Sequence, residues 1–267
     1  MPNVLTFVIP VRHPANARNW VLVKEHLADT LRSISRQDHD GWKGIIVANQ
    51  GADLPPLPVG FEVKHVDFPP NPLYEQGRAD KEKFYEAVRE DKGRRILAGM
   101  LHAGEMGHVM IVDDDDFVSR RLTSFVARNR ERNGWYIRDG YVWGEGDNWL
   151  YLYSGFSEFC GSSHIIRSDC YDLPKDIETA SGAYLRRMLG SHIFIRKHLE
   201  ASGQKLEPLP FLGAVYRVGH AVAHSKSQGV FRYFFLKKSL LRRPSELCRR
   251  VSRLRFRTNR IREEFFG

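Results

Sequence analysis

The sequence predicts an α/β domain built on a largely parallel sheet with helices on both faces. Short apolar runs, each of a length that suits a buried strand, alternate with longer stretches in which apolar residues recur at helical spacing. The resulting order of strand, helix, strand, strand, helix, strand is typical of α/β folds. The strands are expected at 4–10, 43–49, 61–66 and 108–112, and the helices at 21–36 and 81–103.

Local signals mark where these elements end. Pro10 ends the first apolar run, and Gln50-Gly51 closes the second. Three prolines within 67–77 predict a loop between the third run and the second helix, where Gly93 is expected to interrupt the helical pattern. The fourth run leads directly into four consecutive aspartates, Asp113 to Asp116. The sheet is therefore expected to present these carboxylates at the end of a strand.

The second half of the chain follows a different pattern. Residues 134–153 are rich in Tyr and Trp and are broken by glycines, which predicts antiparallel hairpins. Further predictions are a strand at 162–167, a helix at 177–202 capped by Gly203, and one or two strands within 206–217. We expect one domain at 1–228, with halves 1–125 and 126–228, followed by a basic helical extension at 229–267.

The composition is typical of a soluble cytosolic protein. The chain has 267 residues, of which 42% are hydrophobic and 27% charged. No apolar run approaches the roughly 20 residues needed to span a bilayer, and the apolar start is too short for a signal peptide. Cys160, Cys170 and Cys248 show no metal-ligand spacing, so we expect reduced thiols.

The excess positive charge is concentrated at the C-terminal end. Residues 229–267 hold 12 Lys or Arg and 3 Asp or Glu, which accounts for the whole net charge of +9. Apolar residues recur there near helical spacing, which predicts a basic amphipathic helix on an anionic membrane surface. Each basic residue near such a surface contributes about 1 kcal/mol. Packing on a partner or a second subunit is an alternative. Binding to nucleic acid is a second alternative, which is disfavoured because residues 1–228 carry no net charge.

The aspartate run is the most informative motif. Four adjacent carboxylates repel one another, and the repulsion raises some of their pKa values unless a cation is present. Mg²⁺ or Mn²⁺ removes this cost, and a diphosphate can complete the ion's ligands. Ligands of open α/β sheets collect at the carboxyl ends of strands, where this run is expected. The alternative is a solvated acidic turn or a helix cap.

Four segments, taken in order, resemble the nucleotide-binding half of GT-A glycosyltransferases. They are most similar to the large inverting family 2 of bacterial polysaccharide synthesis. In that family the first strand ends in Pro, a helix ends near Gln, the second strand ends before Gly, and the fourth ends in an Asp-x-Asp motif. The matching segments here are 7–10, 31–37, 45–51 and 109–116.

The resemblance implies a GT-A fold and a nucleotide-diphosphate sugar donor, most often a UDP-sugar. It implies that Asp113 contacts the donor ribose or the metal and that Asp115 binds the metal. A register shift of one residue would give these roles to Asp114 and Asp116. The remaining donor-side positions that it implies are Asn49 toward the base, Lys92 and Arg95 toward the nucleotide, and Pro10 and Arg12 as pocket lining. An exposed helix face is the alternative for Lys92 and Arg95.

The catalytic base departs from the family pattern. An acidic pair is expected at the start of a helix, and Ser191-His192 stands in its place. His192 could be the base, because the unperturbed pKa of histidine is about 6.5, or it could be structural. Asp176 and Glu178 are alternative bases, or plain acids at a helix N-terminus.

Two further segments resemble functional segments of the family. The stretch 161–164 resembles a glycine-containing acceptor loop. The stretch 216–225 resembles the segment in which a histidine completes the metal site, a role that would fall to His220 or alternatively to His224. A set of aromatic residues between the two halves suits sugar stacking or a plain core: Trp135, Tyr136, Tyr141, Trp143, Trp149, Tyr151 and Tyr153.

These observations predict a metal-dependent glycosyltransferase that transfers a sugar from a nucleotide-diphosphate sugar to a saccharide or lipid-linked acceptor. The expected location is the cytoplasmic face of the membrane, to which residues 229–267 would attach the protein peripherally. The alternative is a non-catalytic GT-A-like protein or a metal-dependent nucleic-acid-binding protein.

Overall fold

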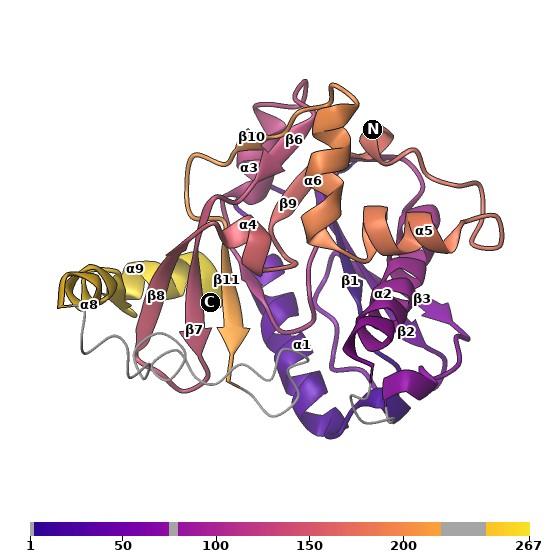
Figure 1. Ribbon diagram of the computed structural model, residues 1–267, viewed down its shortest axis with the longest axis horizontal. Helices are drawn as coiled ribbons and strands as arrows, with labels where there is room; N and C mark the ends of the chain where they lie inside the picture. The colour runs from indigo at the N-terminus through magenta and orange to yellow at the C-terminus, as the bar shows by residue number, and fades with distance from the viewer. Residues whose placement is uncertain (1–2, 75–79, 220–243) are drawn as a thin grey trace.

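The computed structural model describes residues 3–74, 80–219 and 244–267. Its larger sheet has the order β10-β6-β9-β4-β1-β2-β3 (Figure 1). Strands β1 (Asn3–Pro10), β2 (Trp42–Asn49), β3 (Phe61–Val66) and β4 (Met106–Ile111) are parallel neighbours. β9 (His164–Arg167) is antiparallel to both β4 and β6 (Gly134–Tyr136), and β6 pairs in parallel with β10 (Glu207–Pro208). The predicted mainly parallel α/β fold is confirmed.

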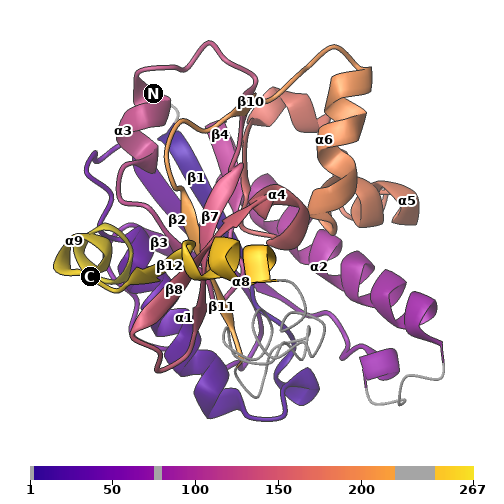
Figure 2. The same ribbon diagram turned by 60° about the vertical axis from the view of Figure 1, so that its left-hand side comes forward.

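Helices cover both faces of this sheet because the central strands are apolar on both faces. Along β1, Phe7 and Ile9 pack with α1 (Trp20–Ile34) and α3 (Leu122–Ala127), whereas Val8 packs with α2 (Lys81–Ala103). Figure 2 shows the sheet between α2 and α6 on one side and α3 on the other. The helices thus cover the two faces of the sheet and leave the ends of its strands uncovered.

A second, smaller sheet has the order β12-β8-β7-β11-β5. It contains β5 (Phe117–Val118), β7 (Asp139–Gly144), β8 (Trp149–Ser154), β11 (Ala214–Val218) and β12 (Leu254–Phe256). The hairpin expected within 134–153 is present as β7 and β8. β5 follows the aspartate run at once, so this run joins the two sheets.

The described part of the C-terminal segment differs from the predicted helical extension. It forms α8 (Pro244–Val251), strand β12, α9 (Asn259–Ile261) and the single turn η6 (Arg262–Phe266). β12 pairs with β8, and Phe265 is buried against Tyr141 with ring centroids 5.9 Å apart. Residues 244–267 are therefore part of the folded body, because their apolar side chains complete the core of the second sheet. Residues 220–243 lie outside the described part.

The predicted helix at 177–202 is divided. The structure has α5 (Gly182–Tyr184), the π-helical turn η4 (Leu185–Leu189) and α6 (His192–Ala201), with Gly190 and Ser191 between the last two. Gly93, expected to interrupt its helix, lies inside the continuous α2. An added Cβ at Gly93 would lie 2.2 Å from the carbonyl oxygen of Leu185. Glycine is thus required here for close packing of α2 on η4.

The remaining elements are short. They are η1 (Pro14–Asn16), η2 (Pro72–Tyr74), α4 (Phe156–Phe159) and η3 (Ser168–Tyr171). Within the described residues, no helix combines the length and hydropathy that crossing a membrane requires.

Candidate functional site

A cavity of about 430 Å³ lies at the carboxyl ends of β1 and β4. The loops after these strands form one wall, α2 forms another, and the start of α6 closes the third side. This is the position at which parallel α/β sheets bind their ligands. Most of the predicted site residues line it: Pro10, Arg12, Lys92, Arg95, Asp113, Asp114, Asp115 and His192.

Asp116 points away from the cavity and is fully buried. Its Oδ2 accepts hydrogen bonds from Ser162 Oγ at 2.6 Å and from Cys160 Sγ at 3.3 Å. Its Oδ1 accepts one from the backbone N–H of Arg217 at 3.2 Å. Burial raises the pKa of Asp116 well above its usual value. Asp116 therefore anchors the loop between the two sheets, which excludes the register in which it would bind a metal.

Asp113 and Asp114 face the cavity and each has a cationic partner. Asp113 forms an ion pair with Lys92, and its backbone N–H donates to Ser162 Oγ at 2.8 Å. Asp114 Oδ1 lies 3.5 Å from Arg12 Nη2. Burial raises the pKa of Asp114 to about 6, although Arg12 opposes this shift. Asp114 Oδ2 is buried and has no hydrogen-bond partner among the described residues.

The arrangement suits a divalent cation that takes part of its ligands from a substrate. Asp115 is half-buried and lines the same cavity as Asp114, whose Oδ2 has no partner among the described residues. Within 3–74, 80–219 and 244–267, no three His, Cys, Asp or Glu side chains converge closely enough to hold a metal ion alone. Mg²⁺ commonly uses one or two carboxylates together with substrate phosphates and water. The carboxylates present fit that pattern. His220 and His224 lie outside the described residues.

Cationic side chains from α2 face the same cavity. Arg89, Lys92 and Arg95 follow one another at a spacing of three residues, which places them on one side of the helix. Burial lowers the pKa of Lys92, but the charge and hydrogen bond of Asp113, with smaller effects from Asp116 and Cys160, together raise it above its usual value. Lys92 is therefore an ammonium ion. Arg89 was missed from the sequence, although its position one turn before Lys92 could have revealed it.

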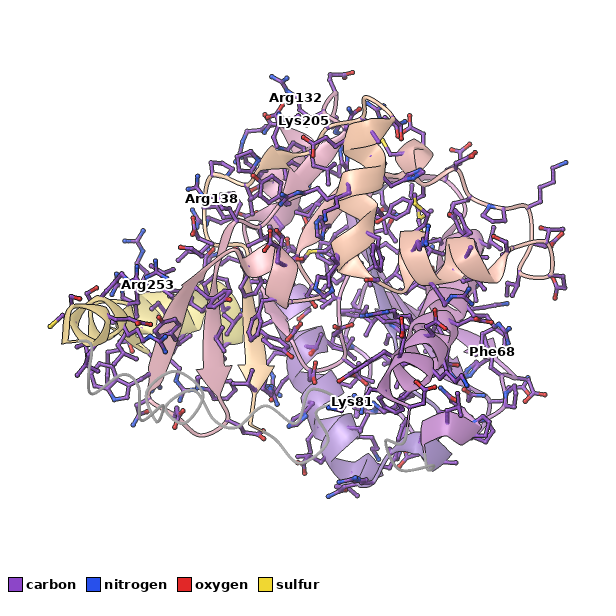
Figure 3. The ribbon with its side chains drawn as sticks, viewed as in Figure 1. Phe68, Lys81, Arg132, Arg138, Lys205 and Arg253 are labelled. Carbon is purple, nitrogen blue, oxygen red and sulfur yellow. The ribbon has the colours of Figure 1, made fainter. Side chains whose placement is uncertain are left out.

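Asn49 does not line the cavity, so its predicted contact with a nucleotide base has no support. Its Oδ1 accepts a hydrogen bond from Arg95 Nη1 at 2.7 Å, and its Nδ2 donates to the carbonyl oxygen of Phe68 at 2.7 Å. Figure 3 labels Phe68 on the outer side of the molecule. Arg95 is also held by Asp91 at 2.9 Å. Asn49 and Asp91 therefore position the guanidinium of Arg95 at the base of the cavity.

His192 is the first residue of α6 and contributes to the cavity wall. Burial lowers its pKa below 6.5, and the Lys92 ammonium lowers it further, while the backbone of Glu158 opposes the shift. The imidazole is therefore neutral near pH 7, as a proton acceptor must be. Asp176 and Glu178 are exposed and do not line the cavity. Asp176 instead caps its own turn by accepting a hydrogen bond from Thr179 N at 2.7 Å.

Gly161 brings the loop before β9 against the acidic loop. An added Cβ would lie 2.5 Å from Asp113 Oδ2 and 3.1 Å from Lys92 Nζ. The position therefore requires glycine because the ion pair occupies the space of a side chain. No acceptor contact follows from this geometry alone.

Most of the predicted sugar-stacking aromatics are core residues. Trp135, Tyr141, Trp143 and Tyr151 are buried, and none of them lines the cavity. Of the two interpretations that the sequence left open, the plain core holds for these four residues: Trp135 packs in the core of the larger sheet, and the other three pack on the second sheet. The cavity is instead lined by Tyr85, Phe159 and Tyr216. Of these, Phe159 and Tyr216 are in contact, with ring centroids 5.2 Å apart.

Comparison with known proteins gives structural similarity only. No protein-family model and no curated protein matches the chain. The crystal structure of S. aureus TarS 1-349 matches with 12% identity and a TM-score of 0.45, over 81% of this chain and 60% of that one. The same protein in complex with UDP-GlcNAc matches with 11% identity and a TM-score of 0.44, over 88% and 64%.

A third match is Rv0371C from Mycobacterium tuberculosis H37Rv in complex with manganese. It has 10% identity and a TM-score of 0.35, over 81% of this chain and 92% of that one. The chain thus spans about 60% of the length of TarS 1-349. These matches are distant similarities of structure. Because these TM-scores lie below 0.5, the proposals below rest on the geometry of this chain.

The Lys92–Asp113 pair gives a first testable prediction. Lys92→Met is expected to weaken binding of a nucleoside diphosphate, the ligand that the sequence resemblance predicts, about tenfold or more, because the cavity loses a cation and Asp113 loses its partner. Calorimetric titration measures the change. Arg94→Met is the matched control, since Arg94 lies on the same helix but does not line the cavity. Equal losses of affinity in the two variants would contradict the assignment.

Proposed function

We propose that this chain is a glycosyltransferase that binds a nucleotide-diphosphate sugar together with Mn²⁺ or Mg²⁺. One observation carries the proposal. A single cavity at the strand ends contains adjacent carboxylates, at Asp114 and Asp115, opposite cations from α2 and from Arg12. A diphosphate needs both groups, because cations neutralise its oxygens and carboxylates hold the ion that bridges them.

The residues divide the chemistry between them. Asp115, with Asp113 or Asp114, would hold the cation, which when bound stabilises the charge that develops on the diphosphate leaving group. Arg12, Arg89 and Lys92 would contact the phosphate oxygens and fix their orientation. The neutral His192 would take the proton of the acceptor hydroxyl, since it is an uncharged imidazole in the cavity lining.

The test is turnover of nucleotide sugars. We expect the protein to consume one UDP-, GDP- or CDP-sugar in the presence of Mn²⁺ or Mg²⁺, and to lose this activity in EDTA. The rate should fall as the pH drops through the lowered pKa of His192, so the acid limb of the pH profile is expected below pH 6.5. A protein that binds nucleotides but releases no nucleoside diphosphate from any sugar donor would support the non-catalytic alternative.

We also propose that the acceptor is lipid-linked and that an anionic lipid surface contacts the C-terminal segment. Residues 244–267 contain seven arginines and three glutamates. Trp149 and Phe256, at 51% and 52% exposure, pair across β8 and β12 with ring centroids 5.3 Å apart. Figure 3 shows Arg253 at this end of the molecule, far from Lys81. Exposed aromatics beside arginines suit the headgroup region of a membrane.

Vesicle sedimentation checks this contact. The full chain is expected to bind vesicles that contain phosphatidylserine and to be released by salt, because arginine–lipid attraction is screened. The double variant Trp149→Ala/Phe256→Ala is expected to bind about tenfold less, through the loss of apolar insertion. Val59→Ala is the control, since Val59 is 96% exposed elsewhere in the fold. Unchanged vesicle binding in the double variant, or a preference for nucleic acid, would contradict the proposal.

A further inference from the structure

A second, much smaller cavity lies behind His192. Its volume is about 20 Å³, and it shares Lys92, Gly161, Ser191 and His192 with the main cavity. His164 of β9 also lines it, and the rest of the lining is mainly apolar. The small cavity therefore lies between the sheet and the start of α6, next to the main cavity.

Each of the two histidines that line this cavity has one ring nitrogen without a hydrogen-bond partner among the described residues. The Nε2 atoms of His164 and His192 are both buried, and neither has a hydrogen-bond partner among the described residues. Buried polar atoms in folded proteins nearly always have a protein or water partner. Because both residues line the same small cavity, one shared partner there would satisfy both atoms.

The hydrogen bonds of Ser163 fix the tautomer of His164. Ser163 Oγ donates its only hydrogen to the carbonyl oxygen of Cys160 at 2.6 Å. Its contact with His164 Nδ1, at 3.1 Å, must then be one in which Nδ1–H donates to Oγ. Burial, with smaller effects from His192 and Arg196, lowers the pKa of His164 to about 3. His164 is therefore neutral, and its Nε2 is an acceptor without a hydrogen.

We propose that one buried water molecule bridges His192 Nε2 and His164 Nε2. The backbone carbonyl of Glu158 accepts from the ring of His192, and because Nε2 has no partner this hydrogen is on Nδ1. Both Nε2 atoms are therefore bare acceptors, and the water donates one hydrogen to each. The cavity has room for one water, since about 10–15 Å³ is sufficient, and it offers the two or more polar partners that a buried water needs. Lys92 and Ser191, which also line the cavity, can complete its hydrogen bonds.

The bridge makes His164 a positioning residue for His192. The water leaves Nε2 as the nitrogen of His192 that can take a proton, because the hydrogen bond from Nδ1–H to the backbone of Glu158 sets the state of the other ring nitrogen. This consequence rests on the proposed function, whereas the water itself does not. The charged groups around His192 are Lys92 and Arg89 on α2 and Asp113 after β4, with Arg196 acting on the neighbouring His164.

Two structural measurements test the water without any activity assay. A high-resolution crystal structure of the full chain is expected to show one water within hydrogen-bond distance of both Nε2 atoms. Nitrogen-15 NMR is expected to show the Nδ1–H tautomer at both His164 and His192. A dry cavity, a direct contact between the two rings, or the opposite tautomer at either residue would overturn the proposal.

Variants test the positioning role. His164→Phe is expected to lower kcat about tenfold, the range seen when residues behind a reactive group are removed, and to leave nucleotide affinity unchanged. His164→Gln, which keeps an acceptor for the water, should recover part of that loss. His108→Phe is the control, because His108 is equally buried but its Nε2 already contacts the carbonyl oxygen of Arg132 at 2.9 Å.

The outcomes separate the two proposals. Equal kcat in His164→Phe and the wild type would remove the positioning role, as would an equal loss in His108→Phe. A wild type that turns over no nucleotide sugar would remove the proposed function, and the crystal and NMR results would still decide the water. If His164→Phe fails to fold, His164→Gln and the wild-type measurements carry the test.

Discussion

Asp115→Asn is expected to lower nucleotide-sugar turnover about 100-fold or more while the protein stays folded. Asp115 is half-buried at the cavity wall, so its replacement leaves no cavity in the core. Asparagine has nearly the same shape but lacks the charge that holds a divalent cation. Loss of an electrophile that stabilises a leaving group typically costs two to three orders of magnitude in rate.

Turnover at saturating Mn²⁺, measured with near-UV circular dichroism as a check of the fold, tests this expectation. Asp40→Asn is the matched control, because Asp40 is exposed and does not line the cavity. A rate within a factor of three of the wild type would remove Asp115 from the metal site. Recovery of the Asp115→Asn rate at high Mn²⁺ concentration would instead support weakened metal binding.

Gly190→Ala is expected to have the largest effect on stability. An added Cβ would lie 1.9 Å from the carbonyl oxygen of Arg89, which is backbone and cannot rotate away. Gly190 has an ordinary helical φ of −77°, so the cost comes from the close contact between α2 and the turn after η4. Overpacking of this kind costs about 3 kcal/mol, equivalent to a fall in Tm of roughly 5–10 °C.

The same substitution should impair the site. Arg89 and His192 flank the contact, so a shift of α2 away from η4 displaces a phosphate-facing cation and the proposed base together. Thermal unfolding and turnover measure the two effects. In the control, Gly182→Ala, the added Cβ meets the flexible side chains of Arg186 and Glu90. Equal unfolding temperatures for the two variants would contradict the packing argument.

The parts of the fold that depend on local pattern could be predicted from the sequence. The apolar runs at 4–10 and 43–49 are the buried strands β1 and β2, because a continuous apolar run suits a parallel strand covered on both faces. The alternating stretch 61–66 is β3, which lies at the edge of the sheet and is only partly buried. Gly93 shows the limit of this approach. Glycine suggests a break in a helix, but here it permits the contact with Leu185, and that contact cannot be foreseen from neighbouring residues.

The site was predicted in outline, and its details depend on distant contacts. The aspartate run was located from four adjacent carboxylates, but Ser162, Cys160 and Arg217 decide that Asp116 turns inward. Asn49 was assigned by resemblance, whereas its hydrogen bond to Arg95 holds it outside the cavity lining. The basic segment was expected to be an appended helix because it holds the excess charge and its apolar residues recur near helical spacing, yet Phe265 inserts into the core.

Calorimetric titration of UDP, GDP and CDP, each in Mn²⁺ and in EDTA, tests the central claim most directly. The account predicts that one of these nucleotides binds in Mn²⁺ and binds at least about tenfold more weakly in EDTA. The reason is that the carboxylates of the cavity hold the ion, and the ion binds the diphosphate together with the cationic side chains. Absence of binding to all of them in both buffers, by a folded protein, would contradict the donor site.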